Sequence, residues 1–391
     1  MIRLQHRIDY LLHRNITELY ITNALRTFAV STVSLFIPIF LLEKGVSLGA
    51  IFLYLMFQYL LYIPICYSAM KFAAKKGIKH SMLMNAPFSI GYFLVLYNID
   101  SIQIATSWVF VFFLLSVLTA ISTALYWNSY HIEFAKYSKK KNAKQVGIIN
   151  IVATTSSALA PLIGALIISA FGFQVMFAIV MIILLLAVFP LFLSKELHEP
   201  FEFSLKDAVT KKTGSLVLPY FSEGVKSIAS SISWPLLLYL IFVSYNDIGS
   251  IFTISHILII IFTWFVSHKI TSANKFNLLK LGTYIHSTTM IVRVIVKNFF
   301  VLNIVQAIGG ISWALIHIPF ASAFYDNTKK LGITSAVYFR ELHLHMGRVA
   351  GTMIALVLLM LLEPADALAG VIIVGAMFTL LMGTMKNVKE T

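Results

Sequence analysis

The sequence predicts an all-α polytopic membrane protein with twelve transmembrane helices, arranged as two six-helix bundles related by a parallel pseudo-repeat. Three observations support this fold class: the composition, twelve apolar segments and a pattern shared by the two halves. The 391 residues are 59% hydrophobic and only 12% charged, whereas a soluble domain carries about 25% charged residues. The expected solvent is therefore the bilayer, which excludes an ordinary cytosolic enzyme, a nucleic-acid-binding domain and a disordered protein.

Each predicted span is long enough to cross a membrane. A spanning helix needs about 20 mostly apolar residues, because all of its backbone polar groups must be satisfied within the segment. Short polar turns such as Glu43-Lys44-Gly45 and Tyr245-Asn246-Asp247 separate the segments. The predicted spans are 21–42, 47–70, 81–98, 105–132, 146–170, 172–194, 215–243, 248–268, 278–297, 299–324, 335–362 and 365–385.

Three polar segments flank the two bundles, which are predicted at 21–194 and 215–385. In residues 1–20 apolar side chains alternate with arginines, which is typical of an amphipathic helix on the membrane surface; a frayed tail is the alternative. These residues lack the continuous apolar core of a secretory signal. Residues 195–214 form the longest polar connection and predict a cytoplasmic central loop, and residues 386–391 a cytoplasmic tail.

Positive charge is concentrated on one predicted side of the membrane. With the N-terminus in the cytoplasm, 24 of the 30 Lys and Arg residues lie in the tails and connections of that side, including Arg340 at the mouth of the eleventh span. The opposite side has only Lys44 and Lys297. This bias predicts that both termini are cytoplasmic, in the plasma (inner) membrane. The net charge of +14 is expected to orient the chain and to contact anionic lipid rather than nucleic acid.

Two matches relate the halves. Residues 20–52 align with residues 220–252 at an offset of 200, which pairs Arg26 with Lys226. The pattern W-x-x-x-H-I-x-F-A begins at Trp127 in the fourth span and again at Trp313 in the tenth. Such self-similarity marks an internal repeat. Six spans in each half make the repeat parallel, as in several transporter folds.

This organisation resembles the major facilitator superfamily over the whole chain. The superfamily's signature loop between spans 2 and 3 reads Gly-x-x-x-Asp-Arg/Lys-x-Gly-Arg-Arg/Lys, and the window 70–79 keeps Lys75, Gly77 and Lys79. The window lacks the first glycine, the acid and the first arginine. The resemblance implies alternating access between the two bundles and a gating role for the three retained residues.

The resemblance also implies that spans 1, 4, 7 and 10 line a central cavity. A charge at mid-bilayer costs about 2.5–3.5 kcal/mol or more, so charged groups on these spans are expected to face protein or water. Aromatic side chains supply contact area to an organic solute, and titratable groups fix its orientation. The predicted substrate-binding residues are Asn23, Arg26, Trp127, His131, Glu223, Lys226, Trp313 and His317.

Structural alternatives stay open for these residues. Glu223 and Lys226 are three positions apart on one helical face and would neutralise each other, or extend to the interface. The two tryptophans also fit an interfacial belt. His131 and His317 fit either proton sites or hydrogen-bonded packing.

The eleventh span carries a second polar group. Helical spacing places Glu341, His345 and Arg348 on one face, which predicts a coupling or gating role, with a static network between the bundles as the alternative. Gly347 and Gly351 are four residues apart and predict a close helix contact.

The sequence predicts a secondary active transporter and not an enzyme. It contains no nucleotide-binding loop and no HExxH or GxSxG motif, so no cofactor is expected. The single cysteine, Cys66, excludes a cysteine cluster, and the histidines lack an acid-rich ligand set, so no metal site is predicted.

The expected substrate is a small organic solute, anionic or zwitterionic, because Arg26 and Lys226 outnumber Glu223. Protons are the expected coupling ion, through Glu223, Glu341 or a histidine, although a uniporter fits as well. The expected partners are this solute and membrane lipid, and the expected state is a monomer. Alternatives are a lipid flippase or hydrophobic-drug exporter of the same fold, and a non-transporting receptor or assembly factor. Arg293 in span 9 is expected to face lipid or to support a neighbouring helix.

Overall fold

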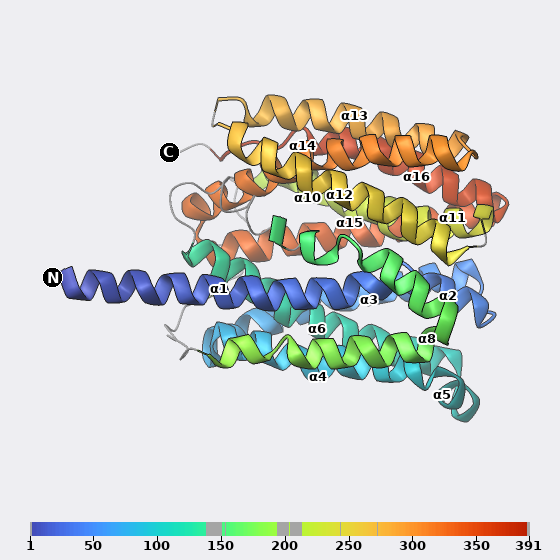
Figure 1. Cartoon of the computed structure of the whole chain (residues 1–391), viewed down its shortest axis with the longest axis horizontal. Helices are drawn as coiled ribbons and strands as arrows, with labels where there is room; N and C mark the ends of the chain where they lie inside the picture. Colours follow the sequence, from blue (N-terminus) through green and yellow to red (C-terminus); the bar gives the residue numbers. More distant parts are fainter. Residues whose placement is uncertain are drawn as a thin grey trace.

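A computed structural model of the chain describes residues 2–137, 151–152, 154–193, 203, 213–242, 244–271 and 273–388, without the side chains of residues 2–16 and 137. The regular structure of these residues is entirely helical, and most helices run along the long axis of the molecule (Figure 1). Both chain termini lie at one end, here called the termini end, and the opposite end is called the far end (Figure 1).

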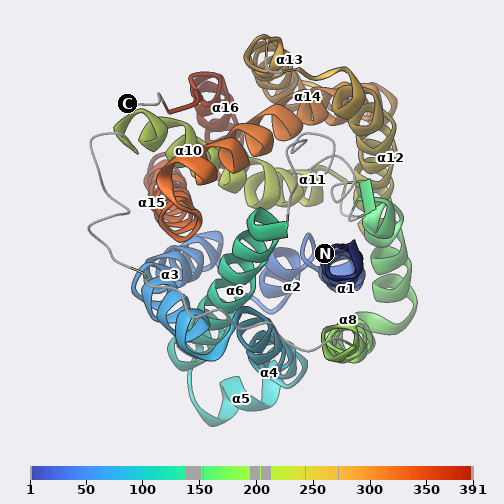
Figure 2. The same ribbon diagram turned by 90° about the vertical axis from the view of Figure 1, so that its left-hand side faces the viewer.

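The helices form two groups that follow the halves of the sequence. Viewed along the long axis, the blue-to-green helices lie on one side and the yellow-to-red helices on the other (Figure 2). The N-terminal half comprises α1 (Ile2–Val33), α2 (Ile37–Glu43), α3 (Leu48–Lys76), α4 (Ile78–Tyr97), α5 (Ile99–Ala105), α6 (Trp108–Tyr137), α8 (Ala160–Leu186) and the 3₁₀ turn η1 (Phe189–Phe192). The C-terminal half comprises α10 (Gly214–Ile228), the π-helical η3 (Ala229–Ser233), α11 (Trp234–Phe242), α12 (Tyr245–Lys269), α13 (Lys275–Ile295), α14 (Phe299–Leu331), α15 (Ile333–Leu361) and α16 (Pro364–Met382).

Among the described residues these elements correspond to the twelve predicted spans, although α13, at the ninth, is helical without meeting the length and hydropathy criteria of a membrane span. Nine described segments meet the length and hydropathy of a membrane span, and α4 does so together with α5, from which it is bent by 76°. One of the nine, containing α8, supplies two spans, because the chain turns back at Gly172 (Figure 1). Gly172 has φ +81°, a left-handed conformation that glycine adopts without steric cost. The predicted boundary between the fifth and sixth spans lies at this residue, whereas residues 146–150, 153 and 194 of those spans lie outside the described residues.

The first span differs from the prediction at its start. α1 is one helix from Ile2 to Val33, so no helix end separates residues 2–20 from the first span. The chain breaks instead at residues 34–36, just before Pro38 in the first turn of α2. Proline has no N–H and its ring clashes with the preceding turn, so a continuous helix through this point is unfavourable. The seventh span changes geometry at the corresponding place, where η3 precedes Pro235.

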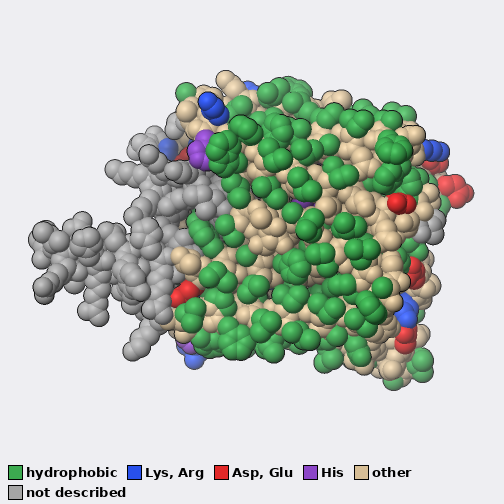
Figure 3. All heavy atoms as spheres, in the orientation of Figure 1, with side chains coloured by type: hydrophobic (Ala, Val, Ile, Leu, Met, Phe, Trp, Pro, Cys, Tyr) green, Lys and Arg blue, Asp and Glu red, His purple; other side chains and the backbone are tan. Residues whose placement is uncertain are grey.

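The outer surface is that of an integral multi-pass membrane protein. Apolar side chains cover the face seen in Figure 3, whereas charged side chains gather at its two ends. Large apolar residues point outward, and Ile104, Phe300 and Met360 are 81%, 77% and 84% exposed. Such a belt is stable only when lipid covers it. The predicted central loop at 195–214 lies mostly outside the described residues, as do residues 389–391 of the predicted tail.

The C-terminal half contains a contact between helix backbones. A Cβ atom added at Gly347 of α15 would collide with the carbonyl oxygen of Phe221, and one added at Gly224 of α10 with that of Leu344. At Gly351 the same atom would lie 2.9 Å from the side chain of Ile228. The predicted small-residue face of the eleventh span is confirmed, and its partner is the seventh span.

Replacing Gly347 by alanine is expected to destabilise the protein by about 1–3 kcal/mol, the usual cost of overpacking. Gly49→Ala is the matched control, because Gly49 is also helical and has no atom within 4 Å of an added Cβ. The measurement is the apparent melting temperature of both variants in detergent. Equal melting temperatures would contradict the tight contact between α10 and α15.

Candidate functional site

Two cations on equivalent spans lie over aromatic rings. The Arg26 guanidinium carbon is 3.9 Å from the ring centroid of Tyr126 and 5.6 Å from that of Trp127. In the other half, the Lys226 Nζ is 3.5 Å from the ring centroid of Trp313. A cation over an aromatic face is attracted by the ring quadrupole, and more strongly when both groups are desolvated. The internal repeat therefore places the same kind of contact, between the first and fourth spans of each half, on both sides of the molecule.

A cavity of about 440 Å³ lies between the two halves. Six of the eight predicted substrate-binding residues line it: Asn23, Trp127, His131, Glu223, Trp313 and His317. Arg26 and Lys226 do not line this cavity, although each contacts the ring of one of its tryptophans. Trp127 and Trp313 thus face an internal space rather than an interfacial belt.

Arg340 joins the two carboxylates near this cavity. Its NH1 donates to Oε1 of Glu341 at 2.5 Å, and its NH2 donates to Oε1 of Glu223 at 3.2 Å. The structural alternative in which Glu223 and Lys226 pair with each other is not what the structure shows, since Arg340 is the ion-pair partner of Glu223 and the Lys226 ammonium lies on the ring of Trp313. Lys226 is the cation nearest to Glu223 in the sequence. The folded chain instead brings the guanidinium of Arg340, which is 117 residues away on α15, within hydrogen-bond distance of Glu223.

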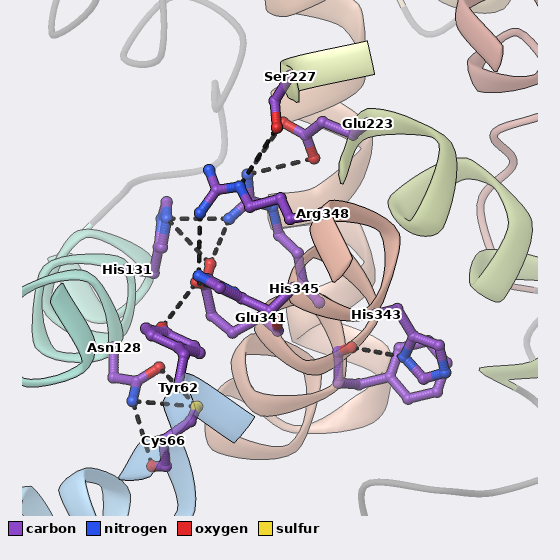
Figure 4. A network of polar contacts seen from close by, with 12 residues as sticks. Tyr62, Cys66, Asn128, His131, Glu223, Ser227, Glu341, His343, His345 and Arg348 are labelled. Carbon is purple, nitrogen blue, oxygen red and sulfur yellow. Dashed lines mark hydrogen bonds and ion pairs between the residues drawn. The ribbon is translucent and has the colours of Figure 1, made fainter. Parts of the chain in front are cut away.

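Two side chains of the N-terminal half bind this charged group (Figure 4). The Tyr62 hydroxyl on α3 donates to Oε2 of Glu341 at 2.9 Å. His131 on α6 has Nε2 3.2 Å from NH1 of Arg340 and Nδ1 2.8 Å from the hydroxyl of Tyr325. Because an arginine can only donate, Nε2 of His131 is the acceptor and its ring is neutral. These contacts connect the halves across the central cavity.

The predicted face of the eleventh span is brought together. His345 Nδ1 donates to the backbone carbonyl of Glu341 at 2.9 Å, and its Nε2 accepts from NH1 of Arg348 at 2.9 Å. The His345 ring stacks on that of Tyr62, with centroids 3.4 Å apart. Arg348 reaches α10 through a 3.3 Å bond from Nε to the hydroxyl of Ser227 (Figure 4). The group is therefore a network between helices of both halves.

The residues of the loop between spans 2 and 3 lie away from this network. Lys75 is exposed, and Gly77 has φ +109° at the junction of α3 and α4. Lys79 is buried and forms a 2.7 Å ion pair with Glu18 of α1. The other half has a similar pair, in which Lys275 binds Asp326 at 2.7 Å. The structure thus brings Lys79 to α1, and brings none of the three loop residues to the cavity.

Asn23 and Arg293 each form a hydrogen bond to a side chain of a neighbouring helix. Asn23 accepts a 3.0 Å hydrogen bond from the hydroxyl of Tyr126, the ring beneath Arg26. Arg293 is buried and does not face lipid. Its NH1 donates to Gln306 at 3.4 Å, and its guanidinium lies over Trp234.

Sequence reasoning missed three members of the network. Arg340 was counted as a charge at the mouth of the eleventh span, because it adjoins Glu341 and neighbouring helical residues do not face each other. Tyr62 is one of 17 tyrosines and carries no sequence signal that separates it from lipid-facing ones. Tyr325 lies two turns beyond His317, and its contact with His131 depends on how the halves meet.

The single cysteine offers a direct measure of these contacts between halves. Cys66 is 1% exposed, one turn from Tyr62 on α3. Tyr62→Phe and His131→Ala each remove a contact between the halves, and each is expected to raise the rate of Cys66 alkylation by N-ethylmaleimide roughly 2- to 10-fold. Ser68→Ala, an exposed position on the same helix, is the control. An unchanged rate in both variants would show that these hydrogen bonds do not hold the halves together.

Comparison with known proteins supports the fold. No family model matches the sequence, and no curated protein matches it significantly. Among solved structures, the human organic anion transporter MFSD10 has a TM-score of 0.67 at 11% identity, covering 94% of this chain and 99% of its own. The transporter FucP in its outward conformation has a TM-score of 0.65 at 13% identity, covering 94% and 97%.

A variant of the Escherichia coli fucose:proton symporter FucP gives a TM-score of 0.66 at 13% identity, covering 94% of this chain and 96% of that one. All three structures are of transporters. Likeness at these identities establishes the fold. The described part of the chain shares the fold of these structures, one of which is described as a major facilitator superfamily transporter.

Proposed function

We propose that this protein is a secondary active transporter that moves a small organic anion or zwitterion across the membrane by alternating access. The observation that carries the proposal is the pair of repeat-related contacts, Arg26 with Trp127 and Lys226 with Trp313, on either side of the cavity between the halves. Two similar half-sites around one cavity suit a solute that is held between two bundles which rock about it.

The charge balance supports an anionic group on the solute. Arg340 is engaged by Glu223 and Glu341. Among the described residues, no carboxylate lies within ion-pair distance of Arg26, Lys226 or Arg348, so these three basic side chains have no acidic partner. A desolvated cation is costly without an anion, and a bound carboxylate would supply one. One structural neighbour is described as an organic anion transporter.

Alternating access requires contacts between the halves that can break. Near the termini end these are the bonds of Tyr62 and His131 to the charged network. At the far end, Glu43 accepts hydrogen bonds from the hydroxyls of Tyr239 and Tyr245. If the two sets of hydrogen bonds break in turn, the cavity would open first to one side of the membrane and then to the other. We further propose, from the charge bias of the sequence, that the termini end faces the cytoplasm, that the membrane is the plasma (inner) membrane and that the protein acts as a monomer.

Proton coupling is proposed for Glu341. This carboxylate is 2% exposed and holds both Arg340 and the Tyr62 hydroxyl. A proton on Glu341 would weaken its bond to Arg340, since the charge-assisted contact depends on the carboxylate. The same event would loosen the link to α3 and so connect protonation to the movement of the halves.

A ligand screen tests the substrate class. The purified protein would be heated with organic anions, organic cations, zwitterions, lysolipids and divalent metals, since a ligand at 100 times its Kd stabilises the folded state by about 2.7 kcal/mol. We expect stabilisation by an anion or zwitterion that is lost in Lys226→Gln and kept in the control Lys280→Gln, which changes an exposed lysine. Stabilisation by lysolipids or hydrophobic cations alone would instead favour a flippase or drug exporter.

Uptake into proteoliposomes tests the coupling. With the ligand found in that screen, Glu341→Gln is expected to abolish accumulation driven by a pH gradient, while exchange of labelled for unlabelled solute continues. Glu363→Gln, at an exposed acid that precedes the first residue of α16, should keep both activities. If Glu341→Gln retained full uptake driven by the pH gradient, Glu341 would have no role in proton coupling.

A further inference from the structure

A second cavity lies inside the N-terminal half. It has a volume of about 210 Å³, and α1, α2, α3, α4 and α6 provide nearly all of its wall. It shares no lining residue with the cavity between Trp127 and Trp313. A third cavity of about 320 Å³ joins the two, because it shares Ser34 and Tyr59 with the second and Arg348 with the first.

Arg26 forms part of the wall of the second cavity. Its Nε is buried without a hydrogen-bond partner among the described residues, and its guanidinium lies over the rings of Tyr126 and Trp127. A guanidinium carries five N–H donors and no acceptor. A buried charged donor without a partner is costly, so this group is poised to take an anionic partner from the cavity.

The rest of the wall is rich in hydroxyl groups. Ser89 and Ser122 lie 2.6 Å apart through their hydroxyl oxygens, and the hydroxyls of Tyr54 and Tyr92 lie 3.4 Å apart. Additional polar side chains in the wall are Ser34, Gln58, Thr119 and Thr123. Hydroxyl groups both donate and accept, and they therefore suit a ligand that itself carries several hydroxyl groups.

The second cavity lies in the N-terminal half, and the alignment of the two halves shows a difference in side-chain size at one position of its wall. In the alignment of residues 20–52 with residues 220–252, Ser34 corresponds to Trp234. Trp234 is 1% exposed, packs in the core and lies under the guanidinium of Arg293. The C-terminal half thus has an indole at the aligned position where the N-terminal half has a serine that lines the cavity.

We propose that the cavity in the N-terminal half is a binding site for a small hydroxylated organic acid, with its carboxylate on Arg26 and its hydroxyl groups on the serine, threonine and tyrosine side chains of the wall. The inference rests on the proposed transport of an organic anion, because the joining cavity would pass the same solute to the space between the halves. Binding itself requires no transport and is measured separately.

The test uses gluconate as the probe and glucose as a neutral probe of similar size. Titration calorimetry on the purified full chain is expected to detect gluconate and not glucose. Arg26→Gln should weaken gluconate binding roughly 10- to 100-fold, the effect of losing a charge-assisted hydrogen bond, and Arg26→Lys should restore part of it.

Ser34→Trp installs the residue of the repeat mate and should abolish binding by filling the cavity. Ser34→Ala is its matched control, because it keeps the space open and should bind gluconate nearly as well as the unaltered protein. The melting temperature without ligand shows whether Ser34→Trp is folded, and Arg26→Gln tests the site without added volume.

Three results would overturn the proposal. One is equal affinity for glucose and gluconate, and another is the absence of gluconate binding. The third is binding that survives both Arg26→Gln and a folded Ser34→Trp but is lost in Lys226→Gln. That third result would place the anion between the halves and would be compatible with the proposed transport. The experiment therefore distinguishes failure of the proposed site in the N-terminal half from failure of the proposed transport function.

Discussion

The structure depends on one guanidinium. Arg340 binds Glu223 on α10 and Glu341 on its own helix, and also meets His131 on α6. In a low-dielectric interior each of these carboxylates would be destabilising alone, whereas paired and hydrogen-bonded charges are tolerated. The neutral ring of His131 and the hydroxyl of Tyr62 complete the hydrogen bonding of this group. The link between the two halves is therefore a consequence of satisfying one buried acid, Glu341, and one partly buried acid, Glu223.

Much of the fold follows from the sequence, because each span must satisfy its own backbone and expose apolar side chains to lipid. The apolar segments predicted all twelve spans, and Gly347 and Gly351 predicted the contact of α15 with a neighbouring helix. The break at residues 34–36 and the continuous helix before it were not predicted. Amphipathic patterning in residues 1–20 does not separate a surface helix from an extension of the first span.

The candidate site was predicted less completely. Intramembrane charge and the repeat singled out residues that do line the central cavity, such as Trp127, Glu223 and Trp313. Their partners could not be predicted, since Arg340 and Tyr62 reach them from helices that are distant in sequence. Local spacing favoured Lys226 as the partner of Glu223, but the packing of α15 against α10 placed a stronger donor there. Whether the predicted residues bind a solute stays a prediction.

The backbone contact between α10 and α15 has a consequence for motion. Because Gly224 and Gly347 leave no side chain between these helices, neither helix can slide or rotate against the other without a collision. The contact therefore favours movement of the two helices as one unit, and the bond from Arg340 to Glu223, which spans them, would be kept in the proposed rearrangement of the halves. In the proposed exchange the bonds that break are those from Tyr62 and His131, so the C-terminal half would carry the pair of Arg340 and Glu223 as a unit while the N-terminal half would supply the removable contacts.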